Sequence, residues 1–459
     1  MYALQNRWKQ EGKKLVYYGL RNRKNLFCNE VTLNAAQRAI VTSLPRELTP
    51  QELRSLGPLV GSCVVPADQV RTTPKTLHEA RFCRDCCAND YMIPGLEFDE
   101  NGLCPMCQTH EETKDLRSLV PLVTDIPKAK NSRFDIALFY TGGKDSTFLL
   151  YYLSMVKKLR VLALTWEIPF MSDSACKSIN NAKKHFPNVE FITRSVCQAD
   201  LQAFYRKLYQ LSENTCACPS LAYVLFYPEM VSNRVPYFTA GNEPAQALGL
   251  YYNHMAPKLL YRFSQKRTPL HFFNIGRILT LKPPLRPGQL HTLKTMGHLA
   301  KKHRRNRQIY SNELVDNIVE ALQEIPDILL PLRRSLRHSS RTGHIPAFVQ
   351  FDLDEISGGK YDWKEAKETI VRQCGWVPPE NQDKALHTSC QIEKCKEHSQ
   401  FVRFYHCRSR MIPFSALEMA LATRGQNLSR KEAIREIENS LGFTLEEVPE
   451  CAIMKKFLS

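Results

Sequence analysis

Between residues 133 and 257, short apolar runs alternate with segments whose apolar positions recur with the helical period. Uninterrupted apolar runs such as FDIALFY and VLALTW are typical of strands that are buried on both faces of a parallel sheet. The intervening segments are long enough to return over the sheet as helices. The sequence therefore predicts an α/β core over residues 130–257. Its expected strands are Phe134–Tyr140, Arg160–Trp166, Val189–Thr193 and Val235–Thr239, and its clearest helices are Asp145–Val156 and Asp173–His185.

The first 80 residues have a different pattern, with two helical stretches between short strands. Ala35–Leu44 is predicted to be helical. A second helix is predicted to begin after Thr49, because Thr49 and Glu52 form a capping box around a proline at the first helical position. Val31–Leu33 and Val60–Pro66 are expected strands. A small N-terminal domain in this order resembles the winged-helix domains that bind precursor peptides in peptide-maturation enzymes, and the alternative is a plain scaffold.

Two further regions follow the core. Residues 258–344 read as a basic helical insertion, with helices expected around Gln289–Asn306 and Ser311–Glu324. Residues 345–459 begin with PAFVQFDL, directly after Ile345, which predicts a last core strand. The remainder is predicted to be a helical C-terminal region.

The net charge of +17 is concentrated in the insertion. Residues 258–341 contain seventeen Lys or Arg against five Asp or Glu. Such a run is either a solvated basic face or a contact surface for nucleic acid, membrane lipid or a phosphorylated substrate. RNA is therefore one expected partner of this stretch.

Export and membrane insertion are not expected. The first residues, MYALQNRWKQEGKK, contain no apolar signal-peptide segment, and no apolar run is long enough to span a bilayer. Sixteen cysteines in a long chain without an export signal favour metal binding or sulfur chemistry over disulfides. We expect a cytoplasmic protein.

The sequence FDIALFY-TGGKDS-TFLLYYL predicts a strand, a glycine turn and a helix in direct succession. Two glycines allow the backbone N–H groups to approach an anion, and the following helix directs its partially positive end to the same point. The spacing differs from the P-loop of kinases, G-x-x-x-x-G-K-[ST], and from G-x-G-x-x-G. The alternative is an ordinary glycine turn between a strand and a helix.

This loop resembles the SGGxDS loop of the PP-loop, or N-type, ATP pyrophosphatases, whose core is adenine nucleotide α-hydrolase-like. Thr141 replaces the usual serine and keeps its hydroxyl. The resemblance implies ATP and Mg²⁺ as cofactors, with the ends of three strands converging on one site. It places the nucleobase or ribose near Leu164, Thr165 and Trp166. The residues implied to bind the cofactor are Thr141, Gly142, Gly143, Lys144, Asp145, Ser146, Thr147, Thr165, Trp166, Gly241 and Asn242, and those implied in catalysis are Lys144, Asp145, Ser146 and Glu243.

The chemistry of such enzymes is adenylation. A carbonyl oxygen is a poor leaving group, so its attack on the α-phosphate of ATP converts it into part of AMP and releases pyrophosphate. A nitrogen or sulfur nucleophile then replaces it, and the loop stabilises the departing pyrophosphate electrostatically. Asp145 is expected to orient the loop or reach Mg²⁺, and Glu243 to hold Mg²⁺ or substrate. Alternatively, Asn242 and Glu243 simply close a turn.

Four cysteines have the spacing of a zinc site. Cys83-x₂-Cys86 and Cys104-x₂-Cys107 are seventeen residues apart, and two such knuckles complete a tetrahedron of thiolates around a structural Zn²⁺. Cys87 is a spare thiol or an alternative ligand. Unrelated buried cysteines and an iron–sulfur cluster are the alternatives.

The intervening sequence, CRDCCANDYMIPGLEFDENGLCPMC, resembles the N-terminal zinc ribbon of the N-acetyl sugar amidotransferases, with Leu96, Phe98, Asp99, Gly102 and Cys104 in the matching places. Later segments, QCGWVP at residues 373–378 and HTSC at 387–390, resemble that family's YGW and H-x-D-C segments. Ser389 stands where the family has Asp. The resemblance covers roughly residues 81–255 and 345–440, and places a zinc ribbon at residues 81–112.

A second group combines cysteine and histidine. His387, Cys390, Cys395 and His398 lie within twelve residues, and Cys216 and Cys218 are expected near the same rim. A second metal site, sulfur-carrying thiols and ordinary helix-packing residues are all consistent with this spacing.

Two activities follow from the resemblance. An amidotransferase would replace an activated amide oxygen, on an N-acetyl sugar, with ammonia from a separate glutaminase subunit. A thiolase would place sulfur on tRNA or a small molecule. A variant of the first acts on a peptide amide presented by residues 1–80. The intact TGGKDS argues against a non-catalytic zinc-stabilised binding protein.

Overall fold

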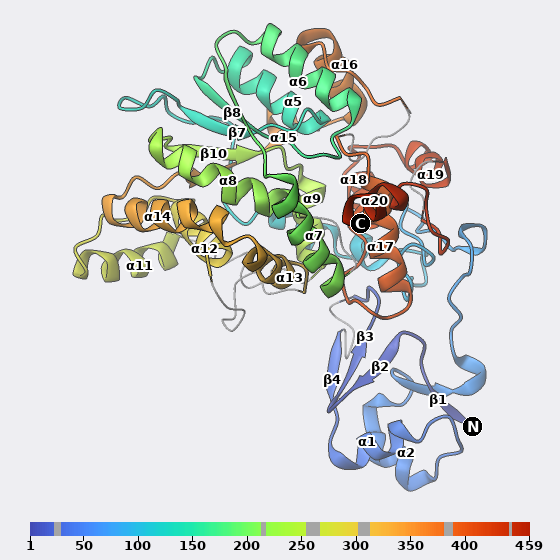
Figure 1. The fold of residues 1–459 in the computed structure, drawn as a ribbon. Coiled ribbons are helices and arrows are strands. Elements are labelled where there is room, and N and C mark those ends of the chain that lie inside the picture. The colour runs from blue at the N-terminus through green and yellow to red at the C-terminus, as the bar shows by residue number, and fades with distance from the viewer. Residues whose placement is uncertain (23–28, 213–216, 254–266, 302–312, 381–388, 440–442) are drawn as a thin grey trace. The chain divides into compact units, whose positions relative to one another are not determined.

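A five-stranded parallel sheet organises the larger part of the chain in this computed structural model (Figure 1). Across the sheet the order is β9 (Glu190–Arg194), β8 (Val161–Trp166), β7 (Ile136–Phe139), β10 (Tyr237–Ala240) and β11 (Ala347–Phe348). All neighbouring strands are parallel. The α/β core with buried parallel strands is therefore confirmed.

The structure describes residues 1–22, 29–212, 217–253, 267–301, 313–380, 389–439 and 443–459. They divide into two units. Unit 1 comprises Met1–Lys114, Glu397–Arg424 and Ser429–Glu446; unit 2 comprises Asp115–Lys396, Gly425–Leu428 and Glu447–Ser459.

Helices cover both faces of the sheet of unit 2. Figure 1 shows α5 (Lys144–Tyr151), α6 (Asp173–His185) and α16 (Trp363–Cys374) on one face, and α8 (Cys218–Ser232) and α14 (Pro326–Thr342) on the other. Because β7 and β8 are buried on both faces, their side chains are almost all apolar. The remaining helices of this unit include α7 (Gln198–Ser212), α9 (Pro244–Tyr252), α11 (Arg267–Leu279), α12 (Gln289–Leu299), α13 (Glu313–Ala321), α15 (Leu353–Ile356) and α20 (Cys451–Leu458).

The strand order reverses between β7 and β10. The chain builds outward from β7 through β8 to β9, and then returns to the other side of β7 with β10 and β11. In open α/β sheets the loops at such a reversal diverge and leave a crevice at the carboxyl ends of the strands, where ligands bind. The glycine loop follows β7 and the segment from Gly241 follows β10, so both lie at this position.

Several expected boundaries are wrong. The expected helix Gln289–Asn306 ends at Leu299 as α12, and residues 302–312 lie outside the described residues. The α-helical part of Asp145–Val156 ends at Tyr151, followed by a π-helical turn, Tyr152–Val156. The single strand expected at 346–353 is two strands. β11 joins the main sheet, whereas β12 (Gln350–Phe351) pairs with β6 (Leu122–Val123), a strand too short for sequence periodicity to reveal.

Unit 1 begins with short strands and two capped helices. β1 (Tyr2–Leu4) pairs with β5 (Val64–Pro66), and β2 (Trp8–Glu11), β3 (Lys14–Tyr17) and β4 (Glu30–Thr32) form a second sheet. The capping box at Thr49 is confirmed at the start of α2 (Pro50–Leu56). The first three strands were not expected, because each has only three or four residues and charged residues interrupt β2.

The same unit contains α1 (Ala35–Thr42), α18 (Phe414–Arg424) and α19 (Arg430–Asn439), while α17 (Glu393–Tyr405) runs from unit 2 into unit 1. The helical C-terminal region is therefore confirmed. Within the described ranges, no helix is both long and apolar enough to cross a membrane.

The sheet of unit 2 is anchored by a carboxylate at the start of β7. Asp135 is buried, and its oxygens accept hydrogen bonds from Arg160 Nη2 at 2.6 Å, from the Arg160 backbone N–H at 2.8 Å and from the Ala129 N–H at 2.7 Å. Burial alone would raise the pKa of Asp135, but these hydrogen bonds outweigh it and the pKa is lowered. The ionised carboxylate therefore stabilises the fold.

We predict that Asp135→Asn lowers the free energy of unfolding by about 2–3 kcal/mol at pH 7, because the charge-assisted bonds are lost. Since the folded-state pKa is lowered, the wild-type advantage is complete above the ordinary carboxyl pKa and is lost as the pH falls through the folded-state value. Urea unfolding between pH 7 and pH 3 measures it. Asp125→Asn, at an exposed ion pair with Lys157, is the control and should change stability by less than about 0.5 kcal/mol. A constant difference between wild type and Asp135→Asn across this pH range would contradict the assignment.

Candidate active site and metal centre

The glycine loop is a tight turn that only glycine fits. Gly142 has φ +71°, and a Cβ there would lie 2.7 Å from the Ala175 carbonyl oxygen of α6. Gly143 is the N-cap of α5, so the first backbone N–H groups of this helix have no partner within the helix. The loop thus presents the N-terminal end of α5 at the carboxyl edge of the sheet.

The two hydroxyls of the loop hold its shape. Thr141 Oγ1 lies 3.2 Å from Ser146 Oγ and accepts a hydrogen bond from the Gly143 N–H at 3.3 Å. Ser146 Oγ also donates to the Gly143 carbonyl at 3.2 Å. A serine at 141 would offer the same oxygen, so threonine preserves the contact. Thr147 instead points into the core, where its hydroxyl lies 3.4 Å from that of Tyr140.

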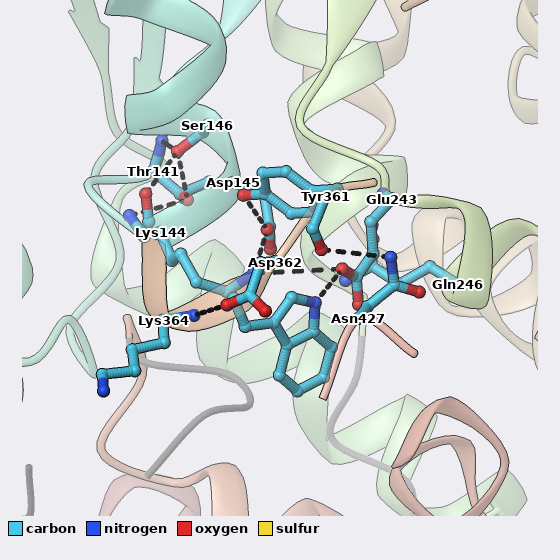
Figure 2. Close-up of polar contacts among 12 residues, drawn as sticks. Thr141, Lys144, Asp145, Ser146, Glu243, Gln246, Tyr361, Asp362, Lys364 and Asn427 are labelled. Carbon is cyan, nitrogen blue, oxygen red and sulfur yellow. Dashed lines mark hydrogen bonds and ion pairs between the residues drawn. The ribbon is translucent and has the colours of Figure 1, made fainter. Parts of the chain in front are cut away.

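Lys144 is a buried cation between two carboxylates. Its side chain is about 3% exposed, and its ammonium group pairs with Asp145 and lies 3.9 Å from Glu243 Oε2. A charge at this depth is retained only where opposite charges compensate its lost hydration. Figure 2 shows these three side chains converging from α5 and from the loop after β10.

Two aromatic residues complete this cluster. The Lys144 Nζ lies 4.8 Å from the ring centroid of Tyr361 and 4.6 Å from that of Trp363, within cation–π range. The Tyr361 hydroxyl donates to Asp145 Oδ1 at 2.8 Å, and Trp363 Nε1 donates to Glu243 Oε2 at 2.5 Å. Burial and the negative charges of Asp145 and Glu243 raise the pKa of Tyr361 well above its usual value, so the phenol stays a donor.

A third aromatic residue holds the glycine turn itself. Trp376 Nε1 donates to the Gly142 carbonyl at 2.9 Å. The preceding Gly375 ends α16 in the left-handed conformation, and its carbonyl accepts a hydrogen bond from Asn181 of α6 at 2.8 Å. The segment QCGWVP therefore connects α16, α6 and the loop.

The segment after β10 packs directly on the start of α5. A Cβ on Gly241 would lie 2.6 Å from the Ser146 backbone nitrogen, so only glycine permits this approach. Glu243 is buried and forms a capping box with Gln246 at the start of α9. Asn242 is exposed. Glu243 thus both closes a turn, as the simpler alternative held, and faces Lys144.

Thr165 and Trp166 end β8 on the same edge. The Thr165 hydroxyl donates to the Tyr140 carbonyl at 3.0 Å and so braces the strand that precedes the loop. Trp166 is buried, and its Nε1 has no hydrogen-bond partner in the described parts of the chain. A nucleobase contact by these two residues stays a prediction.

Sequence reasoning missed the residues that surround Lys144. Tyr361 and Trp363 lie more than 200 positions from the loop, and Asn427 supports Tyr361 by donating to its carbonyl at 3.0 Å. The available signal was a pair of aromatic residues, YDW, directly after the last core strands. Asp362 between them is the N-cap of α16, so the two aromatic residues flank the start of one helix.

In unit 1, the four cysteines gather as a metal-binding group. The sulfurs of Cys83, Cys86, Cys104 and Cys107 all lie within 4.8 Å of one another, with Cys83–Cys107 at 3.8 Å and Cys86–Cys104 at 3.6 Å. Four thiolates about 2.3 Å from a single Zn²⁺ have their sulfurs roughly 3.8 Å apart. The donor set therefore fits one zinc ion, whereas a cluster with several irons needs a wider cage.

Neighbouring residues fix this group. Arg430 donates hydrogen bonds to the carbonyls of Cys83 at 3.0 Å and Cys86 at 3.1 Å. The Asp99 carboxylate accepts hydrogen bonds from the backbone N–H groups of Asn101 and Leu103, just before Cys104. Cys87 is not a member: it is buried, accepts from the Thr423 hydroxyl at 3.4 Å, and burial raises its pKa to about 12. The spare-thiol interpretation of Cys87 is the one that fits.

The second cysteine–histidine group does not form a comparable cluster. Cys216 and His387 lie outside the described residues. Among those described, only Cys83, Cys86, Cys104 and Cys107 bring three or more potential ligands together. Cys395 is buried beside Cys451, and its pKa is raised by burial first and by that neighbour second. Cys390 instead pairs with Met171 through a β-bridge, beyond the end of β8.

The comparisons with known proteins add little. No protein-family model matches the chain, and no curated protein matches it. Among solved structures, it is similar to the U34-tRNA thiolase NcsA from Methanococcus maripaludis, solved with its 4Fe-4S cluster. The two are 15% identical over 56% of this chain and 89% of that one, with a TM-score of 0.23. A likeness this weak carries no argument about the function of this chain.

We predict that the purified chain contains one zinc per molecule and that Cys104→Ser loses it, because three thiolates and a hydroxyl hold the ion far less tightly. Elemental analysis measures the metal, and Cys87→Ser is the matched control, which should retain it. Stoichiometric iron with visible absorption, or full zinc retention in Cys104→Ser, would contradict the assignment.

Proposed function

We propose that this chain is an ATP pyrophosphatase-type enzyme that adenylates an amide or carbonyl oxygen and exchanges it for another atom. The observation that carries the proposal is the cluster of Lys144, Asp145 and Glu243 at the end of the TGGKDS turn, where the strand order reverses. It combines an anion-binding helix end, a cation and two carboxylates, which are the groups that bind a nucleotide with Mg²⁺.

In this proposal, the backbone of the loop and the first turn of α5 bind the phosphates that leave as pyrophosphate. The glycines at 142 and 143 let these N–H groups approach the oxygens. Mg²⁺, when bound, neutralises phosphate charge, and Asp145 and Glu243 are the residues that would hold it. Because both carboxylates contact the same ammonium, Lys144 must turn from them toward the phosphates when Mg²⁺ binds.

The reaction balances without any redox step. The substrate oxygen attacks the α-phosphorus and the bond to the β-phosphate breaks, which releases pyrophosphate. The nucleophile then adds to the activated carbon, and AMP departs with the original oxygen. The role of Lys144 and the loop is to stabilise the charge that develops on the leaving pyrophosphate.

Ammonia is the first candidate nucleophile. The spacing of the four cysteines and the sequence between them resemble the zinc ribbon of the N-acetyl sugar amidotransferases. The distances between the four sulfurs also fit a single zinc ion. The substrate would be an N-acetyl sugar, and ammonia would come from a separate glutaminase.

Sulfur is the second candidate. Cys390 is partly exposed and lies beside Met171, beyond the carboxyl end of β8, so it is on the same edge of the sheet as the loop. A thiolate there could attack the adenylated carbon and displace AMP; a hydrosulfide ion would then add to that carbon and expel the cysteine as its thiolate, which leaves a thiocarbonyl without any redox step. The basic insertion would favour tRNA as that substrate.

A peptide amide is a third substrate class. Unit 1 has an open groove of about 670 Å³ beside β1 and β2, with polar and basic residues on its walls. These include Asn6, Lys9, Arg71 and Thr73. A peptide held there would fit the expectation that residues 1–80 recruit a precursor.

We predict that Asp145→Ala and Gly143→Ala abolish the formation of AMP and pyrophosphate, because both substitutions alter the loop that is proposed to bind the phosphates. Zinc should stay bound, because the four cysteines belong to unit 1. Radiolabelled ATP with a small-molecule extract provides the assay. Asp200→Ala, an acidic residue in the first turn of α7, is the matched control and should keep its activity. Normal rates of AMP formation in both loop variants would show that the loop is not the ATP site.

The mass of the product from a single ATP-dependent turnover separates the candidates. We expect a decrease of about one mass unit if oxygen is replaced by NH, and an increase of about sixteen if it is replaced by sulfur. With sulfur, Cys390→Ser should abolish turnover; with ammonia, it should not. A product of unchanged mass would overturn oxygen exchange altogether.

A further inference from the structure

Helix α11 exposes its apolar side chains. Within this 13-residue helix and the turn after it, Phe272 is 71% exposed, Leu279 79% and Leu281 96%. Phe273, Ile275 and Ile278 are exposed as well. Together these six residues form what we call the α11 patch. Contiguous apolar surface of this kind usually marks a contact with another molecule.

The polar side chains of α11 are the ones that fix it to the fold. Asn274 donates to the Leu285 carbonyl at 2.9 Å and accepts from the Leu285 N–H at 2.7 Å. Arg277 is buried and donates to the carbonyls of Pro283 at 2.7 Å and Ser340 at 3.0 Å. The usual arrangement of a surface helix, apolar side inward, is therefore reversed. The α11 patch is held outward by specific bonds.

The sequence that flanks the patch is strongly basic. From Pro244 to Asn312 the sequence contains thirteen Lys or Arg and no Asp or Glu. Arg267, Lys282 and Arg286 are exposed next to the patch in the chain. The bond from Arg277 to Ser340 brings the end of α14 alongside α11 (Figure 1). This end of α14 adds the exposed Arg337 and Arg341.

We propose that the α11 patch binds the surface of an anionic lipid bilayer, with α11 lying in the headgroup region. Apolar side chains on one side of a helix and Lys or Arg around it are the combination that inserts into this interface. The positive charges attract anionic headgroups, and salt screens this attraction. The proposed contact is peripheral, with α11 lying parallel to the bilayer surface.

Two other occupants fit less well. RNA would engage the positive charges but would leave six apolar side chains without a suitable partner, since phosphate contacts are polar. A second copy of this chain would bring two basic surfaces together with no acidic residue between 244 and 312 to offset the repulsion.

The test is cosedimentation of the full chain with vesicles of phosphatidylcholine alone or with about 30% phosphatidylglycerol. We expect binding only to the anionic vesicles, weakened by salt. Phe272→Ser/Ile275→Ser/Leu279→Ser should reduce it at least tenfold with an unchanged melting temperature, because all three residues are exposed. Met155→Ser/Val156→Ser, which removes two apolar side chains that are about half exposed elsewhere, is the control and should bind like wild type.

Charge and alternative partners complete the test. Arg337→Glu/Arg341→Glu should weaken binding to anionic vesicles. The proposal is overturned if the wild-type chain ignores anionic vesicles, or if the triple variant binds them as wild type does. It is also overturned if the patch substitutions leave vesicle binding unchanged and instead abolish RNA binding in a mobility assay or a concentration-dependent dimer in sedimentation.

Discussion

The ion pairs of Lys144 are the interaction on which the arrangement of the candidate active site depends. A buried ammonium requires compensating charge, and the removal of one partner from such a buried pair typically costs about 3–5 kcal/mol. Asp145 supplies that charge from the first turn of α5, and Glu243 supplies it from the loop after β10. Because the same lysine attracts both, it holds the loops after β7 and β10 together at the point where the strand order reverses.

The aromatic residues make this pairing specific. Tyr361 and Trp363 each donate one hydrogen bond to one carboxylate and present a ring face to the ammonium. A hydrogen-bond donor therefore faces each carboxylate, and an aromatic ring face lies against the ammonium group. Gly142 and Gly241 then allow the backbone to approach closely enough for the cluster to close. A nucleotide would therefore enter a site that already contains the cation and both carboxylates, and Lys144 would exchange its carboxylate partners for the phosphates.

The sequence predicts those parts of the fold and of the candidate site that depend on interactions between residues close together in the chain. Helix Asp173–His185 was predicted residue for residue, because Ser172 caps it and its apolar positions face the sheet. The cysteine group followed from spacing alone. The aromatic residues around Lys144 could not be found in this way, because their contacts depend on tertiary packing over more than 200 residues. Local pattern also failed for β12 and for α11, where side-chain orientation is set by Asn274 and Arg277.

The proposed nucleotide site is the TGGKDS turn after β7. The most direct test is a structure of the full chain with Mg²⁺ and α,β-methylene-ATP, which cannot be split between its α- and β-phosphates. We expect the β- and γ-phosphates on the backbone of residues 142–146, Lys144 turned toward them, and the adenosine beside Thr165 and Trp166. Phosphates bound elsewhere on the chain, with the Lys144 ion pairs unchanged, would contradict it.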